Sequence, residues 1–375
     1  MNTRYGFVST FPPTQCGLAT FAASLRAGLV RHPGTEGIVV RLVETPEPRP
    51  APEVVAEVVM GDRAALHRGA ARLNQCDIAI LQHEYGVYGG ADGDEILVLL
   101  DALEVPSIVV LHTVLVTPSR NQRSILEAVV AKADSVVTMS TTARDRLAAG
   151  YDVDLRKISI IAHGAPVAGP TVATSLRGAR PVVLTWGLLG PGKGIEWGIE
   201  AMARLRDLGP MPQYVIAGQT HPKVVLREGE TYRASLQERA HRLGLGDAIV
   251  FDGRYRDAPA LAQLVQAADV VLLPYDSVDQ VTSGVLIEAV AAGKPVVATR
   301  FSHAVELLGD GAGIVVTHRS PEQIALALRT VLTQGEVAAE MARAAARTAP
   351  RLSWAAVAHQ YEALAARLIT ASVAA

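Results

Sequence analysis

The stretch 270-VVLLPYDSVDQVTSGVLIEAVAAGKPVVA-298 holds, in one continuous run, the pattern that decides the fold. It opens with an apolar run, passes through a polar turn at Thr282-Ser283-Gly284 and enters a segment with apolar residues at helical spacing. Gly293 and Pro295 end this segment, and a second β-branched run follows. A strand, a helix and a second strand in this order are the repeating unit of parallel sheets covered by helices. The stretch therefore predicts part of an α/β fold.

The same alternation continues on both sides of this stretch through the chain of 375 residues. Short apolar runs are separated by Ala- and Leu-rich segments of helical period, which is typical of parallel sheets with helices on both faces. Strands are predicted at residues 5–9, 38–43, 54–59, 77–81, 107–111, 135–139, 158–161, 182–186, 213–217, 249–252, 270–273, 295–298 and 313–316. Helices are predicted, among others, at residues 19–29, 64–73, 120–132, 141–149, 195–208, 233–243, 259–266, 284–292 and 321–332. The fold class is therefore α/β, with doubly wound parallel sheets.

The chain is long enough for two domains, and its composition indicates where the boundary between them lies. Residues 162–181 crowd Gly, Pro, Ala, Ser and Thr together without a periodic apolar face, which is typical of a linker. We therefore predict an N-terminal domain at residues 1–168, joined by a C-terminal helix at about 354–375, and a second domain at residues 178–353. In tandem doubly wound domains, the carboxyl ends of both sets of strands are expected to face one ligand-binding cleft.

The charge balance and the cysteine content limit the classes of protein to which the chain can belong. Lys and Arg total 35, Asp and Glu total 37, and no basic run occurs, so nucleic acid is not an expected partner. The two cysteines, Cys16 and Cys76, fit a reducing compartment. The sequence has neither a leader-like segment nor an uninterrupted apolar stretch of membrane-spanning length. We expect a cytoplasmic protein, while peripheral membrane contact and the oligomeric state stay open.

Two loops between a predicted strand and a predicted helix carry glycines. The first, residues 9–17 (STFPPTQCG), ends at Gly17. A glycine there lets a ligand approach the backbone, and the helix start that follows offers unpaired N–H groups to a phosphate. Any tight strand-to-helix turn also favours a glycine, so this loop alone does not establish a site.

The second loop, residues 186–194 (WGLLGPGKG), copies most of a phosphate-binding P-loop. Gly194 stands where such a loop needs the Ser or Thr hydroxyl that holds magnesium, which argues against a nucleoside triphosphatase. What the loop does predict is one lysine, Lys193, placed with a helix N-terminus near an anionic group.

The polar turn of the opening stretch leads into a helix that carries Glu288. Backbone amides at the helix start and a carboxylate about one turn later would face the same small volume. The amides can bind phosphate or sugar oxygens, and the carboxylate can accept hydrogen bonds from the two ribose hydroxyls. This combination suits a nucleotide sugar.

Together these segments resemble the GT-B glycosyltransferases, most closely the group 1 type known as glycosyltransferase family 4. The matching segments are FPPTQCGLATF at 11–21, LQHEYGVYGG at 81–90, VVLHT at 109–113, GLLGPGKGIE at 187–196, VIAGQT at 215–220, FDGRY at 251–255 and SGVLIEAVAAGKPVVAT at 283–299. The resemblance covers nearly the whole chain and implies two Rossmann-like domains that face a cleft. It further implies retaining transfer of a sugar from a UDP- or GDP-linked donor to a carbohydrate, lipid or small-molecule acceptor, without a metal or another cofactor.

The resemblance also implies a role for particular residues. His112 would approach the transferred sugar, Lys193 would neutralise the diphosphate and Glu288 would hold the ribose. The other implied positions are Gly17 and the backbone of Ser283, Gly284 and Val285 at the donor, Arg254 near the base, and His83, Glu84 and Tyr85 on the acceptor side. The sequences Asp92-Gly-Asp94 and Asp152-Val-Asp154 imitate a metal-binding motif of another glycosyltransferase fold, but we interpret both as surface loops.

Two departures from the family pattern bear on catalysis. The family's Glu-x7-Glu signature reads Gln280-x7-Glu288 here, and an amide supplies no negative charge, although Asp279 is adjacent. Leu188 stands where an arginine is common, with Arg254 or His221 as potential replacements for the lost cation. Two alternatives therefore stay open: a nucleotide-sugar epimerase of the same architecture, and a nucleotide-sugar-binding protein without catalytic activity.

Overall fold

The computed structural model describes residues 2–46, 51–166, 180–278 and 280–374. The chain divides into two compact units, Met1–Gly164 with Trp354–Ala375, and Ala165–Ser353. The sequence placed the domain boundary between residues 168 and 178, a range that lies outside the described residues.

The first unit is built on a seven-stranded parallel sheet with the strand order β3-β2-β1-β4-β5-β6-β7. Its strands are β1 (Arg4–Ser9), β2 (Glu36–Val43), β3 (Val54–Val59), β4 (Ile78–His83), β5 (Ser107–Leu111), β6 (Ser135–Thr138) and β7 (Ile158–Ile160). Its α-helices are α1 (Gly17–Leu29), α2 (Arg63–Leu73), α3 (Glu95–Asp101), α4 (Arg120–Lys132), α5 (Thr141–Gly150) and α14 (Trp354–Ala374). Short 3-10 turns lie at Ala91–Gly93 and Leu155–Lys157. The C-terminal helix α14 packs against α1.

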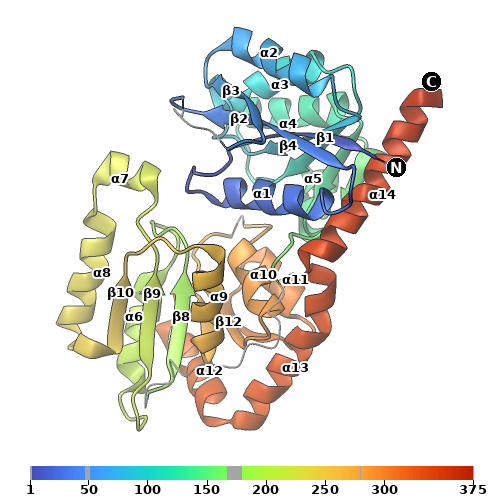
Figure 1. The fold of residues 1–375 in the computed structure, drawn as a ribbon. Helices are drawn as coiled ribbons and strands as arrows, with labels where there is room; N and C mark the ends of the chain where they lie inside the picture. The colour runs from blue at the N-terminus through green and yellow to red at the C-terminus, as the bar shows by residue number, and fades with distance from the viewer. Residues whose placement is uncertain (1, 47–50, 167–179, 279, 375) are drawn as a thin grey trace. The chain divides into compact units, whose positions relative to one another are not determined.

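The second unit has a six-stranded parallel sheet with the order β10-β9-β8-β11-β12-β13 (Figure 1). Its strands are β8 (Val182–Trp186), β9 (Gln213–Ala217), β10 (Ile249–Asp252), β11 (Val270–Leu273), β12 (Val296–Thr299) and β13 (Gly313–Val316). Its α-helices are α6 (Ile195–Met202), α7 (Pro222–Glu228), α8 (Thr231–Arg242), α9 (Ala258–Ala267), α10 (Gly284–Ala291), α11 (Ser302–Leu308), α12 (Pro321–Thr333) and α13 (Gly335–Leu352). Short 3-10 turns lie at Ala203–Leu205 and Gly246–Ala248.

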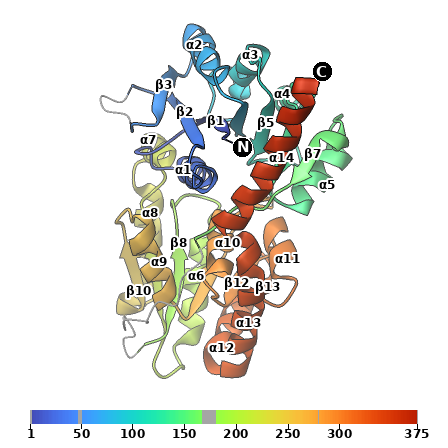
Figure 2. The same cartoon turned by 45° about the vertical axis from the view of Figure 1, so that its right-hand side comes forward.

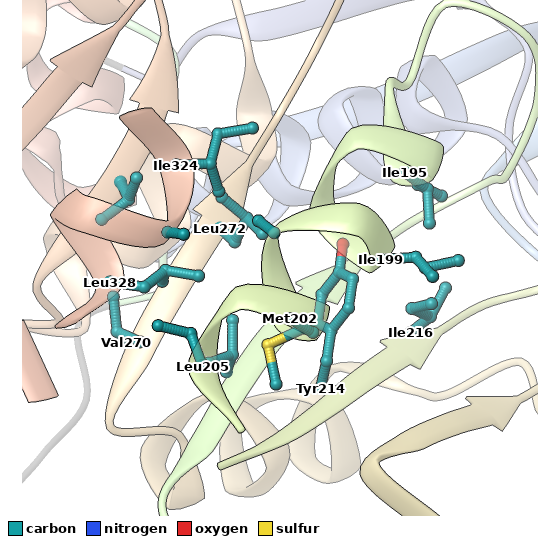
Figure 3. Close-up of a cluster of buried hydrophobic side chains, with 14 of the residues drawn as sticks. Ile195, Ile199, Met202, Leu205, Tyr214, Ile216, Val270, Leu272, Ile324 and Leu328 are labelled. Carbon is teal, nitrogen blue, oxygen red and sulfur yellow. The ribbon is translucent and has the colours of Figure 1, made fainter. Parts of the chain in front are cut away.

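Aliphatic side chains at helical spacing fix the helices of the second unit to its sheet. Ile195, Ile199 and Met202 form the buried stripe of α6 and lie over strand residues such as Tyr214 and Leu272, as Figure 3 shows. Burial of one such side chain contributes about 1.5–3 kcal/mol to folding. The Tyr214 hydroxyl in this layer is satisfied by a 2.8 Å hydrogen bond with Thr185 Oγ1.

The predicted fold class is confirmed, and every predicted strand is present, although β4 extends to His83 rather than ending at residue 81. Helices α3, α7, α11 and α13 were not predicted. The 18-residue α13 escaped prediction because its buried face is made largely of alanines and because Pro350 lies inside it. In the part of the chain that the structure describes, no helix combines the length and the apolar character needed to cross a bilayer.

Candidate active site

Each sheet has the strand order in which the chain reverses direction beside its first strand. In the first unit this switch point lies between β1 and β4, and in the second between β8 and β11. Ligands of doubly wound folds bind at the carboxyl ends of the strands at such a point. The loops that the sequence singled out follow β1, β4, β8 and β11, so each unit carries candidate residues at its switch point.

The glycine-rich loop between β8 and α6 is held against the end of β11. Gly187, Gly192 and Gly194 all have positive φ, of 113°, 88° and 61°. A Cβ on Gly194 would lie 1.8 Å from the Pro274 carbonyl oxygen, so the close approach requires glycine. The Asp276 N–H donates a 2.9 Å hydrogen bond to the Gly192 carbonyl. The predicted phosphate loop is therefore fixed at the switch point.

Lys193 extends from this loop over an aromatic ring. Its Nζ lies 4.4 Å from the centroid of the Tyr275 ring, a cation–π arrangement. Tyr275 follows β11, is 1% exposed, and stacks on Phe301 with 5.2 Å between the ring centroids. No carboxylate of the described residues forms an ion pair with Lys193. An aromatic face positions a cation without cancelling its charge, so the ammonium group stays available to an anion.

The N-terminus of α10 presents backbone amides beside this loop. A Cβ on Gly187 would lie 3.6 Å from Val285 Cγ2, which places the loop against the first turn of the helix. Ser283 caps the helix, and its Oγ accepts a 3.2 Å hydrogen bond from the Leu286 N–H. The Gly284 and Val285 N–H groups precede the first intrahelical bond and therefore point to a ligand or solvent.

Ser283 itself differs from what the resemblance implies. Its N–H donates a 3.0 Å hydrogen bond to Nδ1 of the buried His303, and its carbonyl accepts from the Ile287 N–H. The Ser283 backbone is therefore already engaged within the protein. The predicted donor contacts of this turn rest on Gly284 and Val285.

Glu288 lies one turn further along α10 and reaches the end of β8. The Trp186 indole N–H donates a 3.2 Å hydrogen bond to Glu288 Oε2. Burial raises the pKa of Glu288, and the hydrogen bond from Trp186 opposes this rise. A carboxylate retained in a largely buried position beside free amides and a free ammonium group is typical of a functional site.

Gln280, the amide at the departure from the family signature, is turned toward its own loop. Its Nε2 donates a 3.2 Å hydrogen bond to the Thr282 carbonyl, and the side chain is half-buried. Asp279, which the sequence offered as a substitute carboxylate, lies outside the described residues.

Arg254, predicted to lie near the nucleotide base, is exposed at the end of β10. Its guanidinium pairs with Asp252 at 2.7 Å, and Arg256 pairs with the same carboxylate. The hydrogen bond from Arg254 is the main reason that the pKa of Asp252 lies far below its usual range. The role of Arg256 was not predicted, although a second arginine two residues after the first was visible in the sequence.

His221 does not replace the missing arginine at Leu188. Its Nδ1 accepts a 3.1 Å hydrogen bond from the Lys223 N–H, so this nitrogen carries no proton. Partial burial, followed by the nearby charges of Lys223 and Lys193, lowers the pKa of His221. His221 is therefore neutral near pH 7 and adds no positive charge to the site.

In the first unit, Gly17 is the first residue of α1 and is exposed. No atom lies within 4 Å of the position that a Cβ would occupy, so the helix start is open. Cys16 caps the helix with its Sγ, which accepts from the Ala19 N–H at 3.4 Å. The loop before Gly17 is anchored by Thr14, whose Oγ1 accepts a 2.9 Å hydrogen bond from the buried Arg41.

His112 follows β5 and is oriented by a neighbour that the sequence did not indicate. Its Nε2 lies 2.7 Å from Gln82 Oε1, and its ring meets the edge of Phe21 with 4.9 Å between centroids. Burial, and then the neighbouring His163 and His83, lower the pKa of His112 to about 3. His112 is therefore a neutral imidazole near pH 7, with Nε2–H donating to Gln82 and Nδ1 as an acceptor.

His83, predicted on the acceptor side, has a buried side chain. It ends β4 as expected, but the side chain is 1% exposed and packs against the Tyr85 ring at 5.2 Å. Burial lowers its pKa to about 4, so the ring is neutral. The Glu84 carboxylate accepts hydrogen bonds from the Gly86 N–H at 2.8 Å and from Thr113 Oγ1 at 3.4 Å. His83 packs beneath the loop that follows β4, against Tyr85. An acceptor role for Glu84 and Tyr85 stays a prediction.

The two Asp-x-Asp sequences are occupied by local contacts, as expected of surface loops. Asp92 accepts hydrogen bonds from Asn121 and Gln122, and Asp154 pairs with Arg156 at 2.8 Å. Among the residues described, no group of three or more His, Cys, Asp or Glu side chains could hold a metal ion. Metal independence itself stays a prediction.

Comparison with known proteins decides the family. Residues 173–348 match the sequence profile described as "Glycosyl transferases group 1". This part of the chain belongs to the group 1 glycosyl transferases. The match contains Lys193, Glu288 and the first turn of α10, so the site of the second unit lies within the family's own domain. The resemblance found in the sequence is thereby confirmed.

Two curated relatives share about a third of their aligned residues with the chain. The D-inositol 3-phosphate glycosyltransferase of Corynebacterium glutamicum is 31% identical over 265 residues, which are 66% of this chain and 61% of the relative. The GDP-mannose-dependent alpha-(1-6)-phosphatidylinositol dimannoside mannosyltransferase of Mycobacterium tuberculosis is 31% identical over 168 residues, which are 45% and 39% of the two chains. The chain thus spans less than two thirds of the length of these relatives.

Solved structures of low sequence identity confirm the GT-B fold over nearly the whole chain. Anabaena Alr3699/HepE in complex with UDP and glucose matches 98% of this chain and 100% of its own, with a TM-score of 0.75 at 20% identity. Sucrose-phosphate synthase of Thermosynechococcus elongatus matches the same shares of the two chains with a TM-score of 0.76 at 19% identity. The chain therefore consists of two Rossmann-like domains, as predicted.

Proposed function

We propose that the protein is a glycosyltransferase that transfers a sugar from a nucleotide-diphosphate sugar to a hydroxyl acceptor, with retention of the anomeric configuration. One observation carries the proposal: the second unit gathers the Lys193 ammonium group, the Gly284 and Val285 amides and the Glu288 carboxylate around the β8–β11 switch point. The first two features fit a diphosphate, and the third fits a ribose.

The chemical step breaks the bond between the anomeric carbon and the diphosphate oxygen, and the acceptor oxygen forms the new bond on the same face. The proton of the acceptor hydroxyl passes to the departing diphosphate. Negative charge grows on the diphosphate as it leaves. Lys193 and the α10 amides would stabilise this charge, and each well-aimed donor of this kind contributes on the order of 3 kcal/mol. These groups would supply the positive potential that a metal ion supplies in other transferases, which is why we propose a metal-independent reaction.

The roles implied for the first unit fit the chemistry of its residues. Gly17 leaves the start of α1 open, so a phosphate oxygen can approach its backbone amide. His112 is neutral and held by Gln82, so it would act as a hydrogen-bonding partner for a sugar hydroxyl and not as an acid near pH 7. Both roles stay predictions from the resemblance.

The names of similar proteins narrow the substrates that deserve testing first. One relative is named as GDP-mannose-dependent, and Anabaena Alr3699/HepE has been solved with UDP-glucose and with UDP. We therefore propose a UDP- or GDP-linked donor. The relatives named for inositol phosphate and phosphatidylinositol dimannoside make a polyol phosphate or a glycolipid the first acceptors to test.

A second candidate function is nucleotide-sugar binding without transfer. Gln280 provides no carboxylate and donates its amide to Thr282, and neither Leu188 nor His221 supplies a second cation beside Lys193. These features weaken catalysis while leaving the binding groups in place.

The deciding experiment incubates the protein with UDP-, GDP-, ADP- and dTDP-sugars, with and without polyol phosphates and glycolipids. Free nucleoside diphosphate and new glycoside are measured in buffer with and without EDTA, and NMR gives the anomeric configuration of the product. Release that depends on one donor, rises with an acceptor and survives EDTA supports the proposal. Tight binding of a nucleoside diphosphate without release in any combination would move the second candidate to first place.

A further inference from the structure

We propose that residues 299–303, which connect β12 to α11, position both halves of the diphosphate-binding group, with His303 as the central positioning residue. The inference rests on the proposed function, because it assigns a role toward the same donor. Residues 300–303 lie beyond the last segment of the family resemblance, and no role was implied for them. In Figure 2, α11 and α10 both lie beside β12, which both helices contact.

The first half of the group is Lys193, and the connecting segment holds the ring beneath it. Thr299 Oγ1 donates a 2.5 Å hydrogen bond to the Tyr275 carbonyl, and the buried Phe301 stacks on the Tyr275 ring at an interplanar angle of 30°. The backbone and the ring of Tyr275 are therefore fixed by the same segment. The face that remains carries the Lys193 ammonium group at 4.4 Å.

The second half of the group is the start of α10, and His303 fixes its direction. His303 is 4% exposed, and its Nδ1 accepts the 3.0 Å hydrogen bond from the Ser283 N–H. A backbone N–H can only donate, so Nδ1 is unprotonated and His303 is a neutral imidazole with its proton on Nε2. This bond orients the peptide that immediately precedes the free Gly284 and Val285 amides.

An apolar side chain could fill the space of His303 but could not accept this bond. The Ser283 amide would then be buried without a partner, which favours a rotation of the peptide at the helix start. Such a rotation redirects the two free amides. One short segment, residues 299–303, therefore contacts both Tyr275, which positions Lys193, and the Ser283 peptide, which precedes the free amides. This segment thus sets the separation between Lys193 and the amides.

The closing experiment compares His303→Asn, His303→Gln and His303→Leu. Asn places its Oδ1 near the position of Nδ1, Gln carries its acceptor one bond further, and Leu has no acceptor. Calorimetry measures binding of UDP, GDP and inorganic pyrophosphate, with uridine and guanosine as probes that lack the phosphates. We expect the diphosphate affinity of His303→Asn to lie within about threefold of that of the wild type. The diphosphate affinities of His303→Gln and His303→Leu should be about tenfold weaker, and nucleoside binding should be unchanged in all three variants.

A second pair tests the other half. Tyr275→Phe keeps the aromatic face, and Tyr275→Leu removes it. We expect Tyr275→Phe to retain pyrophosphate binding. We expect the affinity of Tyr275→Leu for pyrophosphate to fall about fivefold or more, because a cation–π contact that is exposed or partly desolvated contributes roughly the corresponding free energy. Because Tyr275 is buried, circular dichroism and thermal melting are used to check that each variant is folded.

The outcomes separate this inference from the proposed function. A wild-type protein that binds diphosphates but transfers no sugar would contradict the proposed transfer and leave the binding comparison intact. Equal diphosphate binding by the three His303 variants, or a His303→Asn variant as weak as His303→Leu, would overturn the inference. It would also be overturned if the wild type bound neither UDP, GDP nor pyrophosphate. Should His303→Leu fail to fold, the Asn and Gln pair decides.

Discussion

Trp186 donates its indole N–H to Glu288 Oε2 at 3.2 Å, although 102 residues separate the two in the sequence. Trp186 ends β8 and Glu288 lies on α10, so the bond connects the strand before the glycine-rich loop to the helix with the free amides. Burial of the carboxylate disfavours its charged form, and this bond partly compensates. The fold thus keeps a carboxylate where an apolar or neutral side chain would be more stable, as functional sites commonly do.

Replacing Glu288 by Gln is therefore expected to stabilise the protein and weaken donor binding. The pKa of Glu288 is raised above its usual 4.5, so the unfolded chain loses this proton first as the pH rises. The wild type should lose stability from about pH 4.5 upward until the folded pKa is passed, and Glu288→Gln should lack this loss. We expect the variant to have a higher free energy of unfolding than the wild type at about pH 8 and a smaller difference at about pH 5, both measured by urea denaturation.

The same Glu288→Gln variant should bind its nucleoside about tenfold more weakly, because a neutral amide oxygen accepts ribose hydroxyls less strongly than a carboxylate. The variant retains an oxygen for the Trp186 N–H, so the helix stays tied to β8. A variant that is less stable than the wild type at both pH values, with unchanged nucleoside binding, would contradict the role assigned to Glu288.

Replacing Lys193 by Ala is expected to lower kcat/KM for sugar transfer by on the order of a hundredfold. The ammonium group is the single side-chain cation that this loop places at the switch point, and it acts where charge develops on the leaving group. The free energy of unfolding should fall by only about 0.5–1 kcal/mol, because the variant loses the cation–π contact with Tyr275 but no ion pair with the described residues. Lys132→Ala, which removes a lysine paired with Asp101 on the first unit, is the matched control. Normal turnover by Lys193→Ala would refute the phosphate role.

Replacing His83 by Phe is expected to make the protein less sensitive to acid. Burial lowers the pKa of His83 from 6.5 to about 4, and within the described chain neither ring nitrogen has a hydrogen-bond partner. Below pH 6.5, His83 therefore binds a proton in the unfolded chain but stays unprotonated in the folded protein. The free energy of unfolding falls as the pH drops from 6.5 toward 4. His83→Phe should remove up to about 3 kcal/mol of this loss, since each unit of pKa shift corresponds to about 1.4 kcal/mol.

The measurement for His83→Phe is the urea midpoint at several pH values between about 4 and about 7, where the two curves should converge as the pH approaches neutrality. His359→Phe is the control, because the His359 side chain is 81% exposed. Parallel curves for the wild type and His83→Phe would show that His83 is not held neutral by burial.

The sequence predicted those parts of the site that depend on local pattern. Gly192 and Gly194 were recognisable because positive φ and close backbone approach demand glycine, and Lys193 and Glu288 followed from their places at helix starts. Contacts between distant segments left no such signal. The sequence around His303 does not indicate that its Nδ1 accepts a hydrogen bond from the Ser283 N–H. The sequence around His83 does not indicate that strand pairing buries its ring.

The same distinction explains the folds of the two units. Strands were predictable because each buried strand is a short β-branched run bounded by polar turns. Helix α13 was not predicted, although its polar and apolar residues recur at helical spacing. Half of its buried residues are alanines, which are also common on exposed helix faces, and Pro350 lies inside the helix.

Gln280→Glu restores the carboxylate of the family signature and tests how the absence of this carboxylate affects kcat and stability. In the wild type the Gln280 amide donates to the Thr282 carbonyl at 3.2 Å, a bond that a carboxylate cannot make. The introduced carboxylate and the Thr282 carbonyl repel each other, so the new side chain should turn away from Thr282, with a loss of about 1 kcal/mol in the free energy of unfolding. A carboxylate released in this way would stabilise positive charge at the anomeric carbon, and we expect kcat to rise by about tenfold with the donor KM little changed. Gln280→Ala, which removes both the amide bond and any charge, should lower stability by a similar amount without raising kcat. A Gln280→Glu variant no faster than Gln280→Ala would mean that the position carries no charge-dependent role in this protein.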